Sequence, residues 1–343
     1  MSLLEVNNVS HIYATGSGRP VLNDVNLTAD AGEVVAIVGE SGCGKTTLGR
    51  MIAGLHQPTE GTINFDDRDI WKLKGKPQKV WRRRVQMVHQ DPYGSLNPGL
   101  TIGSTLAPGM LGHKLATHRN VQDQMLTLLR QVGLDATPEF LHRYPHQLSG
   151  GQRQRVSIAR AISLQPELIV ADEVTSMLDV SMRVAILDLL LSFQQERGIG
   201  FVFISHDFGT VRYFARGGRI AVMFFGYVVE EGPTEELITA PKHPYTHMLL
   251  EAIPIPNPQL AREREQEEAE TERLIGEPAT RGCVFANRCP LVQDICRTER
   301  PKLTAVGSGH RTACHFADEV PPLRHIAAEK ETVKAGAAKE DGA

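Results

Sequence analysis

The sequence predicts an α/β fold built around a parallel sheet, and three short apolar runs carry that prediction. Residues 34–38, 168–171 and 201–204 are apolar throughout, which is typical of strands buried on both faces. A helical pattern extends from about Val180 to Arg197, between the second and third runs. Because strands here alternate with a helix, we expect them to pair in parallel in a doubly wound core.

Two further regions complete the expected fold. Residues 3–38 alternate short apolar runs with Gly-containing turn signals, which indicates strands ahead of residue 39. Between residues 91 and 147, apolar side chains recur at helical spacing, which predicts a mainly α-helical lobe. The residues that show this spacing are Val121, Met125, Leu128, Leu129 and Val132.

Bulk composition narrows the class of protein. The 343 residues are 41% hydrophobic, enough for one large domain with an appendage or for two domains. A formal net charge of -3 supplies no broad cationic field, so we expect no nucleic acid partner. The longest apolar stretch, residues 220–229, is too short to cross a bilayer, and the chain opens without a signal-peptide pattern. We therefore expect a cytoplasmic protein whose five cysteines stay reduced.

Residues 39–47 fit the phosphate-binding pattern G-x-x-x-x-G-K-[ST] and directly follow the apolar run 34–38. Glycines let backbone N–H groups close around phosphates, Lys45 can reach the β and γ oxygens, and the Thr46 hydroxyl can ligate Mg²⁺. The motif predicts that the chain binds a nucleoside triphosphate, with Cys43 as a tolerated small residue. The expected nucleotide-binding residues here are Gly39, Ser41, Gly42, Cys43, Gly44, Lys45, Thr46 and Thr47.

Two carboxylates, Asp172 and Glu173, follow the apolar run 168–171. This order places them at the carboxyl end of a strand, which is the edge where the phosphate loop of a doubly wound sheet also lies. We expect Asp172 to hold Mg²⁺, usually through a water molecule. We expect Glu173 to orient and polarise the water that attacks the γ-phosphorus.

A second anion-binding sequence occurs at residues 148–152, which read Leu-Ser-Gly-Gly-Gln and precede a helical stretch. One nucleotide does not need two such sites in one subunit, so the second is best explained if it faces a nucleotide held by another subunit. The pentapeptide resembles the signature sequence of the ATP-binding subunit of ABC transporters. The residues that the resemblance assigns to the partner's nucleotide are Ser149, Gly150, Gly151 and Gln152.

This family resemblance implies a P-loop NTPase core with an antiparallel β subdomain and an α-helical subdomain. It also implies a head-to-tail pair of subunits that encloses two ATP molecules. Tyr13 resembles the aromatic residue that stacks on adenine. Gln90 resembles the glutamine that touches Mg²⁺ and the attacking water, and His206 resembles the switch histidine that contacts the γ-phosphate. Asp179 resembles the acid of the loop that joins the two subunits.

Two positions depart from the family pattern. Val174 stands where the family usually has Pro, and Met177 stands where it usually has Ala. Neither change removes a reacting group. Proline would have fixed φ and methionine adds volume, so we expect effects on loop stiffness or on the subunit contact.

Two segments, residues 90–98 and 243–246, resemble the peptide and nickel importer branch of the family, and the match extends over residues 3–316. The resemblance implies an ATPase subunit that energises import of peptides or similar small solutes from the cytoplasmic face of the inner membrane. Its implied partners are two permease subunits, an extracytoplasmic solute-binding protein acting indirectly, and a second ATPase subunit. This branch often pairs two different ATPase subunits, so we expect the second subunit to be a different one, although intact motifs permit a homodimer.

Two other functions remain open from the sequence. The first is a soluble ABC-type ATPase that remodels a ribosome or DNA without a permease. The second is a redox regulator that retains the ATPase fold. Neither the paired cassettes nor the long coiled-coil arms of the first class occur in the chain.

Four cysteines in the C-terminal part follow the spacing C-x5-C-x6-C-x17-C, namely Cys283, Cys289, Cys296 and Cys314. Four thiols within about thirty residues predict a metal site. The spacing lacks the close C-x2-C pairs usual for structural zinc, while four cysteinates also suit an iron–sulfur cluster. The branch resemblance implies a [4Fe–4S] cluster; zinc and metal-free thiols remain the alternatives.

Composition shifts predict the domain boundaries. We expect an ATP-binding domain at 1–255, with its helical subdomain at about 91–165, and a charged linker at 256–278 around the run Arg-Glu-Arg-Glu-Gln-Glu-Glu. A cysteine-containing extension follows at 279–324. The Ala-, Lys- and Glu-rich residues 325–343 are expected to form a disordered tail.

Overall fold

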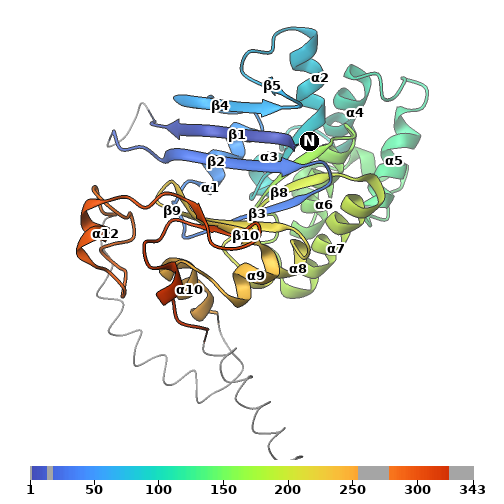
Figure 1. Cartoon of the computed structure of the whole chain (residues 1–343). Helices are drawn as coiled ribbons and strands as arrows, with labels where there is room; N and C mark the ends of the chain where they lie inside the picture. The colour runs from blue at the N-terminus through green and yellow to red at the C-terminus, as the bar shows by residue number, and fades with distance from the viewer. Residues whose placement is uncertain (1, 14–17, 254–277, 324–343) are drawn as a thin grey trace, which may run out of the picture. The chain divides into compact units, whose positions relative to one another are not determined.

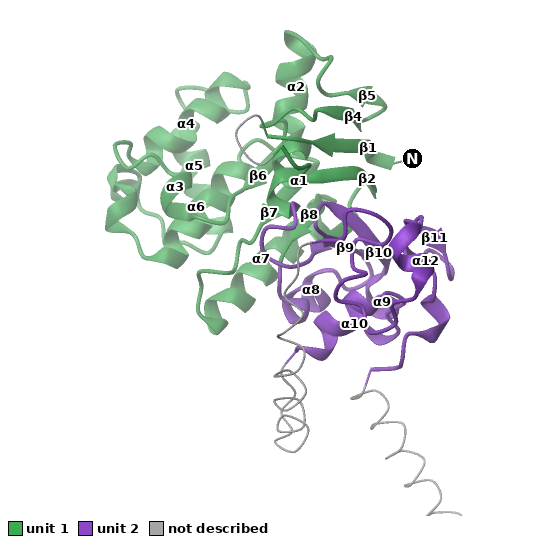
Figure 2. Cartoon of the chain, turned by 90° about the vertical axis from the view of Figure 1, so that its left-hand side faces the viewer, with its two compact units in different colours: residues 1–36, 45–205 green, residues 37–44, 206–343 purple. Residues whose placement is uncertain are grey.

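The computed structural model describes residues 2–13, 18–253 and 278–323. Nearly all of the predicted linker and the whole predicted tail lie outside these ranges. The chain forms two compact units, shown in different colours in Figure 2. The first unit comprises residues 1–36 and 45–205, and the second comprises residues 37–44 and 206–343.

An antiparallel sheet opens the first unit, where the turn signals predicted strands and the family resemblance implied an antiparallel subdomain. Its strands follow the order β2-β1-β4-β5 (Figure 1). Alternate residues of β1, such as Leu4 and Val6, are buried, and Val6 pairs with Leu27 of β2 and with Ile63 of β4. The four strands are β1 (Ser2–His11), β2 (Leu22–Asp30), β4 (Glu60–Phe65) and β5 (Arg68–Asp69).

The predicted parallel core is present in the first unit, where β7 pairs in parallel with both β6 and β8. Every residue of β7 and β8 is buried, which explains why these strands are apolar without alternation. The helix α1 packs against both strands. The α/β class is therefore confirmed. The elements are β3 (Val34–Val38), α1 (Lys45–Ile52), β6 (Val85–Val88), β7 (Leu168–Asp172), α7 (Val180–Arg197) and β8 (Gly200–Ile204).

Helices dominate the sequence between β6 and β7. In α5 the apolar residues Met125, Leu128 and Leu129 are buried, and α4, α5 and α6 contact one another (Figure 1). The helical period identified from the sequence therefore marks the packed face of α5. The helices here, and α2 before β6, are α2 (Lys76–Arg84), α3 (Pro92–Ser95), α4 (Ile102–Gly112), α5 (Val121–Gln131), η1 (Pro138–His142), η2 (Pro145–Gln147) and α6 (Gly150–Ile162).

In the second unit, β10 pairs antiparallel with β9 on one side and with β12 on the other. Because β12 lies within the cysteine-containing segment, between Cys296 and Cys314, the pairs Glu230–Thr312 and Glu231–Arg311 attach that segment to β10. Its elements are α8 (Phe208–Phe214), β9 (Arg219–Phe224), β10 (Tyr227–Pro233), α9 (Thr234–Thr239), α10 (Pro244–Glu251), α12 (Asp294–Thr298), β11 (Thr304–Ala305), β12 (Arg311–Thr312) and η4 (Ala317–Glu319).

A buried histidine strengthens this attachment. His310 precedes β12, and its two ring nitrogens lie 2.8 Å from Glu230 and 3.1 Å from Glu236. Burial lowers the pKa of His310, but the hydrogen bonds and charges of the two carboxylates outweigh burial and raise it overall. The protonated ring can donate to both carboxylates at once, which ties β12 to β10 and α9.

Among the helices that the structure describes, none combines the length and the apolar composition needed to span a bilayer.

Candidate active site

The phosphate-binding motif starts at the end of β3, and its residues are divided between the two units. Gly39 to Gly44 belong to the second unit, while Lys45 to Thr47 open α1 in the first. Gly39 has a φ of 152°, and a Cβ there would lie 2.1 Å from the carbonyl oxygen of Met223. Only glycine fits this close to a neighbouring backbone atom. The sequence of the motif is therefore constrained by backbone geometry at Gly39 as well as by the chemistry of its lysine.

Thr46 and Asp172 meet in the first unit although 126 positions separate them. The Thr46 hydroxyl donates a hydrogen bond of 3.1 Å to the Asp172 carboxylate. Asp172 ends β7 and is only 3% exposed; burial raises the pKa of its carboxyl, and the Thr46 hydrogen bond opposes that rise only in part. Hydroxyl and carboxylate oxygens suit Mg²⁺, which completes its coordination with water and substrate phosphates. The donor pair therefore fits the predicted magnesium position.

Gln90 and Glu173 form a second polar pair. The Gln90 amide nitrogen donates a hydrogen bond of 2.8 Å to a Glu173 carboxylate oxygen. Glu173 has a φ of 45°, which is costly for a residue with a Cβ, and its backbone N–H donates to the Ile204 carbonyl. Strain of this kind, of order 1–3 kcal/mol, persists where the surrounding structure fixes the residue. The carboxylate is thus held in one direction.

One cavity of the first unit brings Thr46, Gln90 and Asp172 together. Arg50 and Arg160 also line it, and sequence reasoning missed both. Arg50 follows Thr46 by one helical turn on α1, so periodicity could have found it. Arg160 had no such signal, because it reaches the cavity from α6, where it donates to the Ser95 carbonyl over 2.6 Å. Two guanidinium groups make the cavity suitable for phosphate oxygens.

Tyr13 lies within the first unit beside α1. Its hydroxyl is 3.1 Å from the Thr47 hydroxyl, and its ring makes edge-on contacts with His11 and His56. The contact with Thr47 ties Tyr13 to the end of the phosphate-binding motif. The proposed adenine platform is therefore adjacent to residues that the motif supplies.

The Leu-Ser-Gly-Gly-Gln segment forms the start of α6. Ser149 caps the helix by accepting a hydrogen bond of 3.3 Å from the Gln152 N–H, and the Gln152 side chain accepts one of 3.0 Å from the Ser149 N–H. This capping box leaves the Ser149 hydroxyl proton available to an external acceptor. A Cβ at Gly151 would lie 2.4 Å from the Met182 sulfur. The segment does not line the cavity at Thr46.

Asp179 caps α7, since its carboxylate accepts hydrogen bonds from the Met182 N–H and the Ser181 hydroxyl. The Met182 contact is the main reason that the pKa of Asp179 is lowered. Of the two departures from the family pattern, Val174 is buried and Met177 is 60% exposed. Met177 is therefore the one that can affect a contact with another chain.

Two further predicted residues belong to the second unit. His206 is exposed and immediately precedes the residue that caps α8. Cys43 is buried, and its carbonyl accepts a hydrogen bond of 2.9 Å from the Gly226 N–H. Burial of the small Cys43 side chain agrees with a packing role in the loop.

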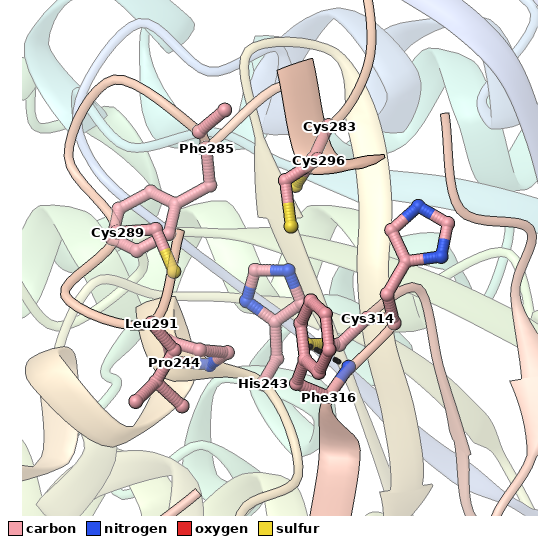
Figure 3. A pocket seen from close by; sticks show the side chains of 11 residues that line it. His243, Pro244, Cys283, Phe285, Cys289, Leu291, Cys296, Cys314 and Phe316 are labelled. Carbon is pink, nitrogen blue, oxygen red and sulfur yellow. Dashed lines mark hydrogen bonds between the residues drawn. The ribbon is translucent and has the colours of Figure 1, made fainter. Parts of the chain in front are cut away.

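The iron–sulfur prediction is wrong. Cys283, Cys289, Cys296 and Cys314 do line one pocket of the second unit (Figure 3). However, no group of three or more His, Cys, Asp or Glu side chains in the described residues is arranged to hold a metal ion. Burial raises the pKa of Cys289 to about 11 and that of Cys314 to about 12, so these thiols stay protonated near neutral pH. Metal ligation requires thiolates, so a metal ion would have to displace these protons.

Comparison with known proteins assigns the family. Residues 22–176 match the family model described as ABC transporter, and residues 229–296 match the one described as oligopeptide/dipeptide transporter, C-terminal region. The chain is 44% identical to "Probable peptide ABC transporter ATP-binding protein y4tS" of Sinorhizobium fredii, with 92% of this chain and 90% of that protein covered. It is 39% identical to "Oligopeptide transport ATP-binding protein AppF" of Bacillus subtilis, with 92% and 97% covered.

Solved structures agree with this assignment. The ATP-binding cassette MJ0796, in a dimeric post-hydrolysis state with ADP and Pi, has a TM-score of 0.60 and 32% identity, with 67% of this chain and 98% of that chain covered. CbiO1 of Clostridium perfringens, part of the ABC transporter complex cbiONQ, has a TM-score of 0.61 and 26% identity, with 77% and 99% covered. The chain therefore belongs to the family of ABC transporter ATP-binding proteins.

Proposed function

We propose that this chain is the ATP-binding and ATP-hydrolysing subunit that energises an ABC importer for peptides or similar small solutes. The observation that carries the proposal is the cavity lined by Thr46, Asp172 and Gln90, in which Thr46 is hydrogen-bonded to Asp172 and Gln90 is hydrogen-bonded to Glu173. The relatives are named as peptide and oligopeptide transport proteins, which supports the solute class. They do not support the alternative of an ATPase that acts without a permease.

The predicted site residues divide the work of hydrolysis. Lys45 and the N–H groups of the loop bind the phosphate oxygens, and Thr46 and Asp172 hold Mg²⁺. The ion, when bound, neutralises charge that develops on the phosphates. Glu173 accepts a proton from water as the water oxygen bonds to the γ-phosphorus and the bond to the ADP oxygen breaks. Gln90 orients the Glu173 carboxylate through the hydrogen bond already described, and His206 contacts the γ-phosphate.

The remaining site residues act on the nucleotide of a second subunit. Ser149, Gly150, Gly151 and Gln152 present the start of α6, where N–H groups and the helix dipole favour an anion. Asp179 lies at the start of α7, in the loop that faces the second subunit. Because each chain then supplies only half of each site, ATP closes the pair and hydrolysis releases it.

The partners and domain limits follow from the same proposal. A second ATPase subunit, different from this one, completes the pair, and two permease subunits receive the motion of the helical subdomain at about 91–165. An extracytoplasmic solute-binding protein delivers the solute to the permease, and this chain works on the cytoplasmic face of the inner membrane. The ATP-binding domain occupies residues 1–255 and the extension residues 279–324.

Glu173→Gln tests the proposal. The variant keeps its ability to bind ATP and loses about 10²–10⁴-fold in turnover, since the amide cannot accept the proton of water. Turnover is measured in the assembled transporter, and ATP-dependent pairing is measured by size-exclusion chromatography, where the variant accumulates the closed pair.

Glu167→Gln is the matched control, because Glu167 precedes β7 at its opposite end and pairs with Arg84 near the surface. We expect nearly normal turnover from it. Unchanged turnover in Glu173→Gln would remove Glu173 from its assigned role.

A further inference from the structure

Glu40, the second residue of the phosphate-binding loop, is held by residues from two later segments of the chain. Arg288 donates two hydrogen bonds to its carboxylate, of 3.0 Å from Nη1 and 2.8 Å from Nη2. The Glu40 backbone N–H donates a hydrogen bond of 2.9 Å to the Tyr245 hydroxyl. All three residues belong to the second unit. The side chain and the main chain of Glu40 are thus both fixed.

The ion pair is partly shielded from water. The side chain of Arg288 is 20% exposed and that of Glu40 is 35% exposed. The Arg288 guanidinium also lies over the rings of Phe224 and Phe285, at 5.5 Å and 5.9 Å from their centroids. A bidentate pair whose cation is oriented by aromatic rings has less freedom to exchange with water than an ordinary surface pair.

Tyr245 is positioned by the start of α10. His243 caps this helix by accepting a hydrogen bond of 3.1 Å from the Tyr245 N–H, and burial lowers the pKa of His243 to about 3, so the ring is a neutral acceptor. Tyr245 is fully buried and packs against Phe224 and Phe285. The segment 243–246, which the family resemblance singled out, therefore supports the phosphate-binding loop.

Arg288 is positioned by the cysteine-containing extension. It lies just before Cys289, and its N–H donates to the Phe285 carbonyl over 2.9 Å in a tight turn. Phe285 also lines the pocket of the four cysteines, where Figure 3 shows its ring beside Cys289. Phe285 thus connects Arg288 to the packing of this pocket.

We propose that Arg288 is a positioning residue of the ATP-binding site, through which the C-terminal extension sets the affinity of the phosphate-binding loop for ATP. The inference rests on the proposed function, in which this loop binds the triphosphate. Two physical effects act together. Arg288 neutralises a carboxylate in a loop that must accept a polyanion, and its two hydrogen bonds hold the loop in one conformation.

The first test is the ratio of kinetic constants in Arg288→Gln. We expect KM for Mg-ATP to rise about tenfold with little change in kcat, because the residue acts on binding and touches no reacting atom. Arg288→Lys restores the charge without the bidentate geometry, so its KM for Mg-ATP lies between that of the wild type and that of Arg288→Gln. Both constants are measured in the complete transporter.

Glu40→Gln, alone and combined with Arg288→Gln, separates the two effects. In the double variant the unpaired carboxylate is gone, so KM falls below that of Arg288→Gln but stays above the wild-type value. A double variant with the same KM as Arg288→Gln would remove the electrostatic part of the proposal. Glu40→Gln also keeps the inference testable if Arg288→Gln fails to fold.

Arg311→Gln is the matched control, because Arg311 lies in the same extension but pairs with Glu231 of β10 and not with the phosphate-binding loop. We expect its KM for Mg-ATP to equal that of the wild type. If Arg311→Gln raises KM as much as Arg288→Gln, or if Arg288→Gln stays within twofold of the wild type, the inference is overturned. A wild-type chain that fails to hydrolyse ATP in its transporter would instead overturn the proposed function.

Discussion

Two clusters of polar or reactive side chains in this chain resemble metal sites in sequence, but they differ in the structure. The first comprises Thr46, Gln90, Asp172 and Glu173 in the first unit, and the second comprises the four cysteines of the second unit. In both clusters, residues that are separated in the sequence lie close together in the structure. Only the first cluster offers oxygen donors suited to a cation and a cavity that can accept phosphates.

The difference arises from the surroundings of the donor atoms. Two cationic residues, Arg50 and Arg160, line the cavity of the first cluster. Apolar side chains surround the thiols of the second, notably Phe285, Leu291 and Phe316. Burial among apolar groups stabilises the neutral thiol, which is the form that does not bind metal. Cysteine spacing can therefore predict proximity, but the protonation state depends on packing that the spacing does not describe.

Asp172→Asn, in the first cluster, should have the largest effect of the changes considered. We expect Mg-ATP hydrolysis to fall at least about 10²-fold, since the amide is a poor ligand for Mg²⁺. The nucleotide-free variant should nevertheless be more stable than the wild type near neutral pH. Burial raises the pKa of Asp172, so its ionised form opposes folding once the pH exceeds that raised value, and asparagine removes this penalty.

Thermal unfolding of both nucleotide-free proteins checks the prediction. The gain from Asp172→Asn should be large near neutral pH and should shrink in acid, where the wild-type carboxyl is protonated. A variant that is less stable than the wild type near neutral pH would show that the ionised carboxylate stabilises the fold. Asp66→Asn, at an exposed carboxylate, is a suitable control for the loss of one surface charge.

The features of the candidate site that can be anticipated from the sequence depend on local pattern or on sheet topology. The phosphate loop and the start of α6 are contiguous motifs, and their backbone geometry is encoded by glycines such as Gly39. The contact between Thr46 and Asp172 follows from the rule that parallel strands present their carboxyl ends at one edge. The assignments of His206 and Asp179 rest on family resemblance alone and stay predictions.

The parts that the sequence did not predict depend on packing between distant segments. Arg288 and Glu40 are 248 positions apart, and neither belongs to a motif that specifies a partner. The same holds for Arg160, whose guanidinium reaches the cavity only because α6 packs against α3. The cysteine prediction failed because the four residues line one pocket without forming, among the described residues, a group arranged to hold a metal ion.

His310→Gln examines how the second unit holds its extension. In the wild type, Glu230 and Glu236 raise the pKa of His310 despite burial. A raised pKa means that the stabilisation is complete below the ordinary value of about 6.5 and is lost as pH rises through the folded-state pKa. The variant should therefore cost about 1.5–3 kcal/mol at low pH and less at about pH 8.5.

Hydrogen exchange of the amides that pair β10 with β12 reports this effect. In the wild type, protection of the Ala313 amide, which donates to the Val229 carbonyl over 2.8 Å, should decrease with rising pH after correction for intrinsic exchange, whereas in His310→Gln it should be nearly constant. Equal pH dependence in both proteins would show that another group controls the attachment.

The smallest expected effect concerns the cysteine pocket and comes from comparing Cys283→Ser with Cys283→Ala. Cys283 is only 8% exposed, and burial raises the pKa of its thiol. A serine hydroxyl in this apolar pocket gives up its hydrogen bonds to water and gains no hydrogen-bond partner in return. The serine variant should therefore be less stable than the alanine variant by about 1–3 kcal/mol. Both variants should keep the wild-type KM for Mg-ATP if Phe285 and Arg288 hold their places. Iron in the anaerobically purified wild type, lost in both variants, would show instead that these thiols ligate a metal and that the two clusters are alike.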